Sequence, residues 1–207
     1  MMNKIAVLGC VISSFVVSIQ ASSIDVLKDD FLSKVGTDRQ KVILALLSSD
    51  TNYQKGMEYL NKQSYMLKMP ELNFHGQKIE GRFLPDCEKA MPFLTESLKV
   101  KNNTLSAYLG LHCINNDAFI KKSPDLLQKK RIFAESLYSN EKQLCIGYLA
   151  YGDVLMNGVA GTPEPSKALK VYEEGKSKCS RLASDWEKKV IDIKIEQARF
   201  KTKPQTK

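Results

Sequence analysis

Residues 142–178 constrain the fold more than any other segment, because apolar spacing and turn residues here indicate the same structure. Apolar side chains recur at the three- and four-residue steps of one helical face: Leu144, Tyr148, Tyr151 and Leu155. Asn157 and Gly158 follow, and both residue types tolerate the left-handed conformation that ends a helix. Thr162 and Ser166 are alternative N-caps for a second helix. The segment therefore predicts a helix hairpin that turns near Thr162.

The same segment resembles a Sel-one-like repeat, the two-helix relative of the tetratricopeptide repeat. Seven residues fall on the family pattern without a gap: Cys145, Gly152, Gly158, Glu164, Lys167, Ala168 and Tyr172. Ala160-Gly161 and Gly175-Lys176 depart from it. Residues 104–138 resemble the repeat more weakly, with Gly110 in the place of Gly152. The resemblance implies an all-α fold, a short right-handed solenoid of antiparallel helix pairs, and a role as scaffold or adaptor.

The first 21 residues have the pattern of a secretory signal peptide. Lys4 gives a short basic start, residues 5–19 are apolar, and small residues follow from Ala21. The alternatives are a lipoprotein signal ending at Cys10, although the apolar run continues well beyond it, and a retained membrane anchor. We expect a periplasmic or secreted domain over residues 22–200, a disordered tail over 201–207, and no membrane association after signal cleavage.

The chain is basic, with 31 Lys and Arg against 23 Asp and Glu and a net charge of +8, which cleavage of the leader lowers by one. A basic protein attracts polyanions. The lysines are spread through every predicted helix, however, and the dense runs at residues 121–122 and 129–131 are short. This distribution favours a solvated lysine-rich surface. Because we expect the chain to be exported, we expect no nucleic-acid partner.

Four cysteines remain after the leader, an even number that suggests two disulfides in an exported protein. Facing residues of an antiparallel hairpin lie equally far from its turn. Cys145 and Cys179 are equidistant from Thr162, and Cys87 and Cys113 are equidistant from residue 100, beside a polar turn. We therefore predict the pairs Cys87–Cys113 and Cys145–Cys179. Free buried cysteines are the alternative, and the absence of close ligand spacing argues against zinc.

The N-terminal segments predict further helices of the stack. Residues 24–32 predict a short helix that covers the first repeat. Residues 39–49 are apolar on almost all sides, which is typical of an internal helix. The helix predicted over residues 53–67 would pair with it, with Lys55-Gly56 where the repeat has Lys-Ala.

Two further segments complete the predicted stack. Pro92 is a difficulty in the helix that follows Asp86, so either this helix bends or it begins later and leaves Cys87 in the preceding turn. Residues 182–200 alternate apolar and charged side chains and predict an amphipathic helix that caps the C-terminal end.

Residues 69–85 have no helical periodicity and carry Pro70, Gly76, Gly81 and Pro85. Long insertions of this kind inside compact domains are often functional. Two interpretations stay open: a binding loop that presents side chains such as Phe74 and Arg82, or a connector whose aromatic rings fold back onto the core.

The resemblance also implies where a partner would bind. Solenoids of helix pairs line their concave face with the first helix of each pair. The expected contact residues are Tyr108, His112, Tyr148 and Tyr151, together with Phe74 and Arg82 of the loop. The alternative is that the same rings fill the core between helices, which we expect of Tyr151 more than of Tyr148.

No recognised catalytic pattern is present: there is no G-x-S-x-G elbow, no H-E-x-x-H and no phosphate-binding glycine loop. We therefore expect a protein that is not an enzyme and needs no cofactor or metal. The leading hypothesis is an exported scaffold or adaptor that binds a protein or peptide. One alternative is an immunity protein or inhibitor of a secreted effector or hydrolase, and another is a cell-envelope enzyme that uses His75 or Glu80.

Overall fold

The computed structural model describes residues 24–61, 63–66, 83–116, 124–179 and 183–202. This part of the chain contains nine helices and two short strands, in the order α2 (Ile24–Lys34), α3 (Thr37–Ser49), α4 (Thr51–Asn61), β1 (Gln63–Met66), β2 (Phe83–Pro85), α5 (Cys87–Lys101), α6 (Thr104–Asn116), α7 (Pro124–Asn140), α8 (Cys145–Asn157), α9 (Pro165–Lys178) and α10 (Asp185–Thr202). The predicted helical fold is confirmed, apart from the small hairpin of strands.

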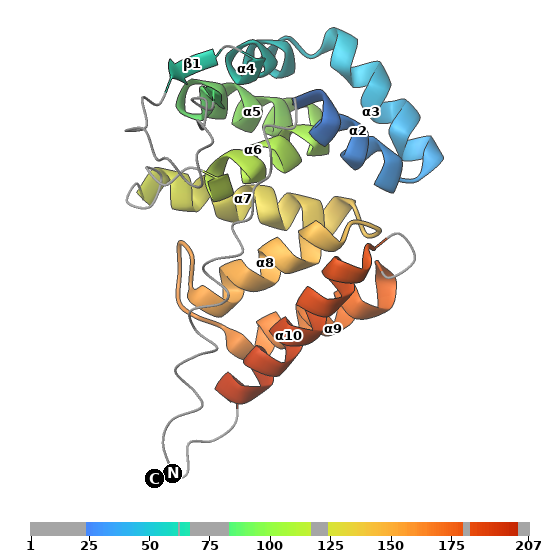
Figure 1. Ribbon diagram of the computed structural model, residues 1–207, viewed down its shortest axis with the longest axis vertical. Helices are drawn as coiled ribbons and strands as arrows, with labels where there is room; N and C mark the ends of the chain where they lie inside the picture. Colours follow the sequence, from blue (N-terminus) through green and yellow to red (C-terminus); the bar gives the residue numbers. More distant parts are fainter. Residues whose placement is uncertain (1–23, 62, 67–82, 117–123, 180–182, 203–207) are drawn as a thin grey trace, which may run out of the picture.

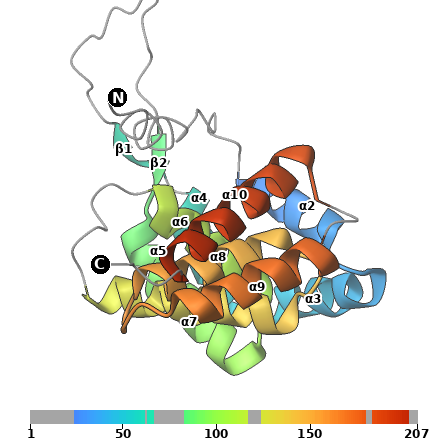
Figure 2. The ribbon, with the colours of Figure 1, turned by 90° about the horizontal axis from the view of Figure 1, so that it is seen from below.

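From α4 onward, each helix packs against the next helix in the chain. Figure 1 shows this order as a descent from α4 at the top to α9 and α10 at the bottom. In the view from below, α9 and α10 lie in front of α8 (Figure 2). Helix α2 leaves this order and lies against α6. The described helices thus form a stack in which α2 adds a cover on one side.

Helix α3 does not have the internal position that its apolar sequence suggested. Ile43 is buried, but Val42 is 49% exposed and Leu44 46% exposed. The reason is that α3 lies at the outer edge of the molecule, where only one side meets other helices (Figure 1). Helix α4 packs mainly on α5 instead, and the side chain of Leu94 occupies the space beside Gly56.

A hairpin of strands replaces part of the predicted helix over residues 53–67. Helix α4 ends at Asn61, and β1 pairs antiparallel with β2, with Met66 opposite Phe83 and Gln63 opposite Pro85. The expected loop over residues 69–85 therefore ends in a strand. Most of it, including Phe74 and Arg82, lies outside the described residues.

Glycines allow the helix pairs to approach closely at equivalent places. A Cβ atom on Gly152 would lie 2.1 Å from Cε1 of Tyr172, and one on Gly110 would lie 2.3 Å from Cε2 of Phe133. Real Cβ atoms do not tolerate such contacts. The α8–α9 and α6–α7 pairs are thus each closed by an aromatic ring that lies against a glycine, and these glycines are the two that the sequence comparison placed at matching positions.

Two disulfides join the helices in the predicted pairs. Cys87 is bonded to Cys113 with a Cα–Cα distance of 5.5 Å, and Cys145 to Cys179 with 5.2 Å. Cys87 is the first residue of α5, which continues through Pro92 without a later start. The carboxylate of Asp86 accepts a hydrogen bond from the Lys89 N–H and so caps this helix.

The turn between α8 and α9 differs from the prediction at its second end. Gly158 has a φ of 65° and ends α8, as its sequence position indicated. Helix α9 begins at Pro165, so its N-cap position is occupied by Glu164 and not by Thr162 or Ser166. The Glu164 N–H donates back to the Leu155 carbonyl over 2.7 Å, which satisfies one amide that would otherwise lack a partner.

Helix α10 forms where the capping helix was predicted. Ser184 and Glu187 make reciprocal bonds at its start: the Ser184 N–H donates to the Glu187 carboxylate over 2.8 Å, and the Glu187 N–H donates to the Ser184 hydroxyl over 3.2 Å. This capping box fixes the first turn. Lys194 and Arg199 then tie α10 to α8 and α9 through Asp153 and Glu173.

Candidate partner-binding surface

Tyr108 does not face outward as expected, because α2 covers it. Its ring lies 5.2 Å from that of Phe31, and its hydroxyl donates a hydrogen bond of 2.8 Å to the Asp30 carboxylate. Burial, together with the charge of Asp30, raises the pKa of the Tyr108 hydroxyl. The concave-face placement of Tyr108 is therefore wrong, since α2 already fills that position.

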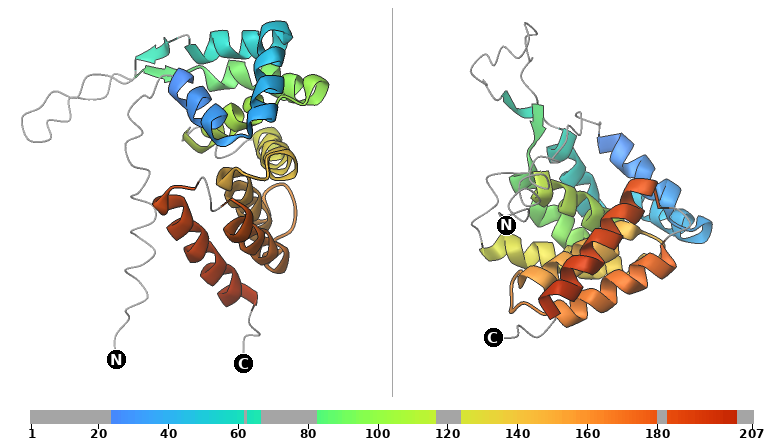
Figure 3. Two further views of the ribbon diagram at one scale, coloured as in Figure 1. Left: turned by 90° about the vertical axis from the view of Figure 1, so that its right-hand side faces the viewer. Right: turned by 60° about the horizontal axis from the view of Figure 1, so that its bottom comes forward.

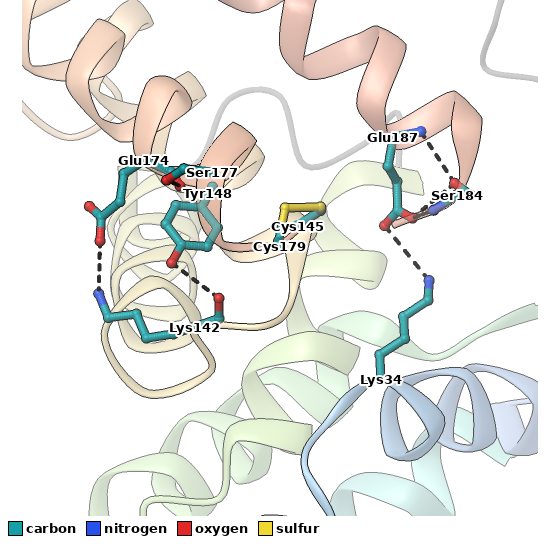
Figure 4. Close-up of a disulfide and its surroundings, with 9 residues drawn as sticks. All are labelled: Lys34, Lys142, Cys145, Tyr148, Glu174, Ser177, Cys179, Ser184 and Glu187. Carbon is teal, nitrogen blue, oxygen red and sulfur yellow. Dashed lines mark hydrogen bonds and ion pairs between the residues drawn. A yellow bond between two sulfur atoms is a disulfide. The ribbon is translucent and has the colours of Figure 1, made fainter. Parts of the chain in front are cut away.

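His112 lies half-buried beside Tyr108, with the two ring centres 4.7 Å apart in an edge-to-face arrangement. Burial lowers the pKa of His112 below its ordinary value of 6.5, and this effect outweighs the opposite effect of the nearby Asp30 charge. The imidazole is therefore neutral at pH 7. Lys34 pairs with Asp30 at 3.1 Å. It also pairs with Glu187 at 3.7 Å, as Figure 4 shows. These contacts join α2, α6 and the start of α10, which is a structural role for the cluster.

Tyr148 lies fully buried in the core, against our expectation that it would be the more accessible of the two α8 tyrosines. A Cβ atom on Gly175 would lie only 2.7 Å from the Cβ of Tyr148. The hydroxyl donates to the Lys142 carbonyl over 3.1 Å (Figure 4). Burial, with the nearby charge of Glu174, raises its pKa to about 12. Tyr148 therefore holds α8 against α9 and is not free to anchor a partner.

Tyr151, expected in the core, remains half-buried at the surface. Its ring stacks on that of Tyr138 from α7, with 4.9 Å between the ring centres. The ammonium group of Lys142 lies 4.0 Å from the centre of the Tyr138 ring, a favourable cation–π distance. We call Tyr138, Lys142, Tyr151 and Glu174 the tyrosine surface.

The polar groups of the tyrosine surface are held in place by one another. The Tyr138 hydroxyl donates a hydrogen bond of 2.7 Å to Glu174, and this bond raises the pKa of Tyr138 to about 12. Bonds from Lys178 and Tyr138 lower the pKa of Glu174, which keeps its carboxylate charged. Lys142 lies 3.9 Å from the same carboxylate (Figure 4). The surface thus presents pre-positioned aromatic rings with fixed charges at their edge.

The sequence did not single out Tyr138, Lys142 or Glu174. The signal that could have found them is Gly147. A Cβ there would lie 3.0 Å from the backbone of residues Leu137 and Tyr138, so α7 and α8 cross closely at this glycine. Because the two helices cross closely, the Tyr138 ring contacts Tyr151 of α8, and its hydroxyl reaches Glu174 of α9.

An open hollow of about 390 Å³ lies between α8 and α10, lined in part by Met156 and Phe200. Asp153, at its edge, accepts bonds of 2.7 Å from the Tyr172 hydroxyl and from Lys194. Burial, with the charge of Asp153, raises the pKa of Tyr172. Asp153 is therefore engaged in structural bonds, and Met156 and Phe200 are the apolar members of a lining that is otherwise polar or charged.

Two buried carboxylates, those of Asp50 and Glu141, are enclosed by structural bonds. Asp50 accepts from the Ser97 hydroxyl at 2.6 Å, the Asn103 amide at 3.1 Å and the Tyr53 N–H at 3.0 Å. Glu141 accepts from Thr104 at 2.5 Å and from Arg39 at 2.8 Å. Neither lines the hollows that adjoin α10. Both connect helix ends that are far apart in sequence.

Within the described residues, no group of three or more His, Cys, Asp and Glu side chains is placed to hold a metal ion. In the same part of the chain, no helix has the length and apolar character needed to cross a membrane. The two disulfides are typical of proteins in oxidising, extracytoplasmic compartments.

Comparisons of the chain with family models, with curated proteins and with solved structures found no match.

Proposed function

We propose that the protein is a periplasmic or secreted interaction scaffold, a short right-handed solenoid of Sel-one-like helix pairs that binds a protein or peptide partner through the tyrosine surface. The two disulfides support export. The chain-order packing of α4 to α10 and the glycine–aromatic contacts of Gly110 and Gly152 support the repeat architecture.

One observation carries the choice of surface: a stacked pair of half-buried tyrosines lies beneath a lysine on a frame that a disulfide staples. Tyrosine rings give a partner a large apolar contact and a hydrogen bond at low entropic cost. Binding hot spots are enriched in such residues, particularly where neighbours hold them in position. Tyr138 and Tyr151 meet these conditions, whereas Tyr108 and Tyr148 are enclosed.

The test begins with capture of a partner from envelope or culture-medium extract by the disulfide-bonded chain, followed by affinity measurements on variants. Tyr138→Ala should weaken binding at least about tenfold, because it removes the ring that Tyr151 and Lys142 contact. Tyr138→Phe is the matched control, since it keeps the ring and loses only the bond to Glu174. It should change affinity less than about threefold.

Thermal melting separates a contact role from a structural one. Because Tyr138 is only half-buried, we expect Tyr138→Ala to melt as a folded, cooperative protein. Unchanged affinity in a folded Tyr138→Ala protein would contradict the tyrosine surface. Failure of the wild-type chain to capture any partner would contradict the scaffold function itself.

A further inference from the structure

Helix α10 carries an unusual row of exposed apolar side chains. Trp186 is 61% exposed, Ile193 50% and Phe200 77%, and the three lie seven residues apart. Seven residues are close to two turns of a helix, so these side chains form one stripe along its length. Single exposed apolar residues need no explanation, but an aligned series of three large ones marks an interaction surface.

The stripe points away from the rest of the molecule. Ile191, Ile195 and Ala198 are buried and form the inner face of α10. Because each residue turns the helix by about 100°, the opposite side of α10 carries the three exposed residues Trp186, Ile193 and Phe200. In the left view of Figure 3, α10 (dark red) lies at the lower edge of the described helices, with α8 and α9 on one side of it. Helix α10 thus covers the stack with one face and presents a second apolar face outward.

The outer face is self-complementary about Ile193. Trp186 and Phe200 lie equally far from Ile193 in the two directions along the helix. If a second copy of α10 lies antiparallel with Ile193 on Ile193, each Trp186 meets a Phe200 and the central pair is identical. A two-fold interface requires this reciprocity, in which residue i contacts j and j contacts i.

Charges beside the stripe have the same symmetry. Lys189 precedes Ile193 by four residues and Glu196 follows it by three, on the same flank of the stripe. Both are exposed. Glu196 pairs with Arg199 of its own helix at 2.9 Å, whereas no ion pair of Lys189 is found among the described residues. In an antiparallel pair, the Lys189 of each copy lies beside the Glu196 of the other. In a parallel pair each Lys189 would instead lie level with the other Lys189, about two turns from either Glu196, so no lysine would meet a glutamate.

We propose that the outer face of α10 binds α10 of a second copy of this chain, antiparallel and two-fold symmetric about Ile193. Trp186 of the second copy then lies against Phe200, next to the hollow that Phe200 and Met156 line. The tyrosine surface lies on α7, α8 and α9 and takes no part in this contact. The dimer is therefore independent of the proposed partner binding.

The test is sedimentation velocity of the full exported chain, with both disulfides formed, across a concentration series up to the order of 100 µM. We expect a concentration-dependent monomer–dimer equilibrium. Ile193→Asp should weaken dimerisation at least tenfold without altering the melting curve, because the side chain is outside the core. Lys188→Ala is the matched control, since Lys188 is exposed on α10 away from the stripe, and it should leave the equilibrium unchanged.

A charge exchange tests the antiparallel register. Lys189→Glu should weaken the dimer severalfold, because it places two glutamates together, and the double variant Lys189→Glu/Glu196→Lys should restore it. A chain that stays monomeric throughout, or a dimer that Ile193→Asp does not weaken, would overturn the proposal. A double variant as weak as Lys189→Glu alone would overturn the antiparallel arrangement.

Discussion

The α5–α6 and α8–α9 hairpins are each stapled by a disulfide, yet different contacts hold them. In α8–α9 the contact that closes the hairpin comes from within it: the Tyr172 ring lies on Gly152, and its hydroxyl donates to Asp153. In α5–α6 the turn is fixed from outside, by Asp50 from the α3–α4 junction and by Glu141 from the end of α7. One hairpin is closed by near neighbours, and the other by distant polar groups.

This difference has two consequences. Contacts between residues close in sequence leave a pattern that can be recognised, whereas contacts over long separations do not. Carboxylates take part in both hairpins, but Asp50 is 1% exposed, whereas the side chains of Asp153 and Glu174 are 34% and 26% exposed. Protonation of a fully buried carboxylate leaves its donors without an accessible substitute, whereas water can replace the bonds of an exposed one. The N-terminal half of the stack should therefore be the more acid-sensitive half.

The largest expected effect on the free energy of unfolding comes from removing the disulfides, which both hairpins have. The Cys87–Cys113 and Cys145–Cys179 bonds span separations of 26 and 34 residues. On the chain-entropy model, replacing either pair with alanines should lower the free energy of unfolding by about 3–4 kcal/mol. Urea denaturation of the two double variants measures this. A loss below about 1 kcal/mol for one pair would mean that its hairpin does not depend on the staple.

The sequence predicted the two disulfides and the α8–α9 hairpin because equidistant cysteines, Gly152 and Gly158 are local signals. It did not predict that Asp50 would bond Ser97 and Asn103, since no sequence pattern links polar residues so far apart. The same limit explains the misplaced tyrosines: α2 covers Tyr108 through a fold-back that local periodicity does not encode.

Substitution of the contact glycines should have the next largest effect on the free energy of unfolding, and the effect should differ between the α8–α9 and α6–α7 pairs. Gly152→Ala should lower the free energy of unfolding by about 3 kcal/mol, because the Tyr172 ring is anchored through its hydroxyl to Asp153 and cannot retreat. Gly110→Ala should cost less, about 1–2 kcal/mol, since the Phe133 ring is buried but has no hydrogen bond that fixes its position.

Chemical denaturation of both glycine variants, with Tyr172→Phe as a background, checks this difference. In that background the ring is free, so Gly152→Ala should approach the smaller cost of Gly110→Ala. Equal losses for the two variants in the wild-type background would contradict the role of the hydroxyl anchor.

The smallest expected effect concerns Asp50. Burial alone would raise the pKa of this carboxyl. The hydrogen bonds that it accepts from Ser97, the Tyr53 N–H and Asn103 outweigh that effect together, so the pKa lies below its ordinary value of 3.8. Asp50→Asn should cost only about 1 kcal/mol at pH 7 in urea denaturation. The side-chain oxygen Oδ1 of Asn103 is buried without a bonding partner among the described residues, and a flipped Asn103 side-chain amide can accept from the new side chain. A cost above about 3 kcal/mol would exclude this rearrangement.

The sign of the pH effect follows from the direction of this shift. A carboxyl whose pKa is lower in the folded state stabilises the fold fully above its unfolded pKa, near 3.8, and loses that contribution as the pH falls through its folded pKa. Acidification below about pH 4 should thus weaken the contacts around Asp50 progressively. Asp50→Asn has no carboxyl at this position and should lack that component of acid sensitivity.

Hydrogen exchange of the disulfide-bonded chain at about pH 6 and pH 3, corrected for intrinsic rates and read on peptides from α5–α6 and α8–α9, tests the contrast between the two hairpins most directly. The account predicts that α5–α6 loses more protection at the lower pH than α8–α9, and that Asp50→Asn narrows this difference. Equal loss of protection in the two hairpins, or an unchanged difference in Asp50→Asn, would contradict it.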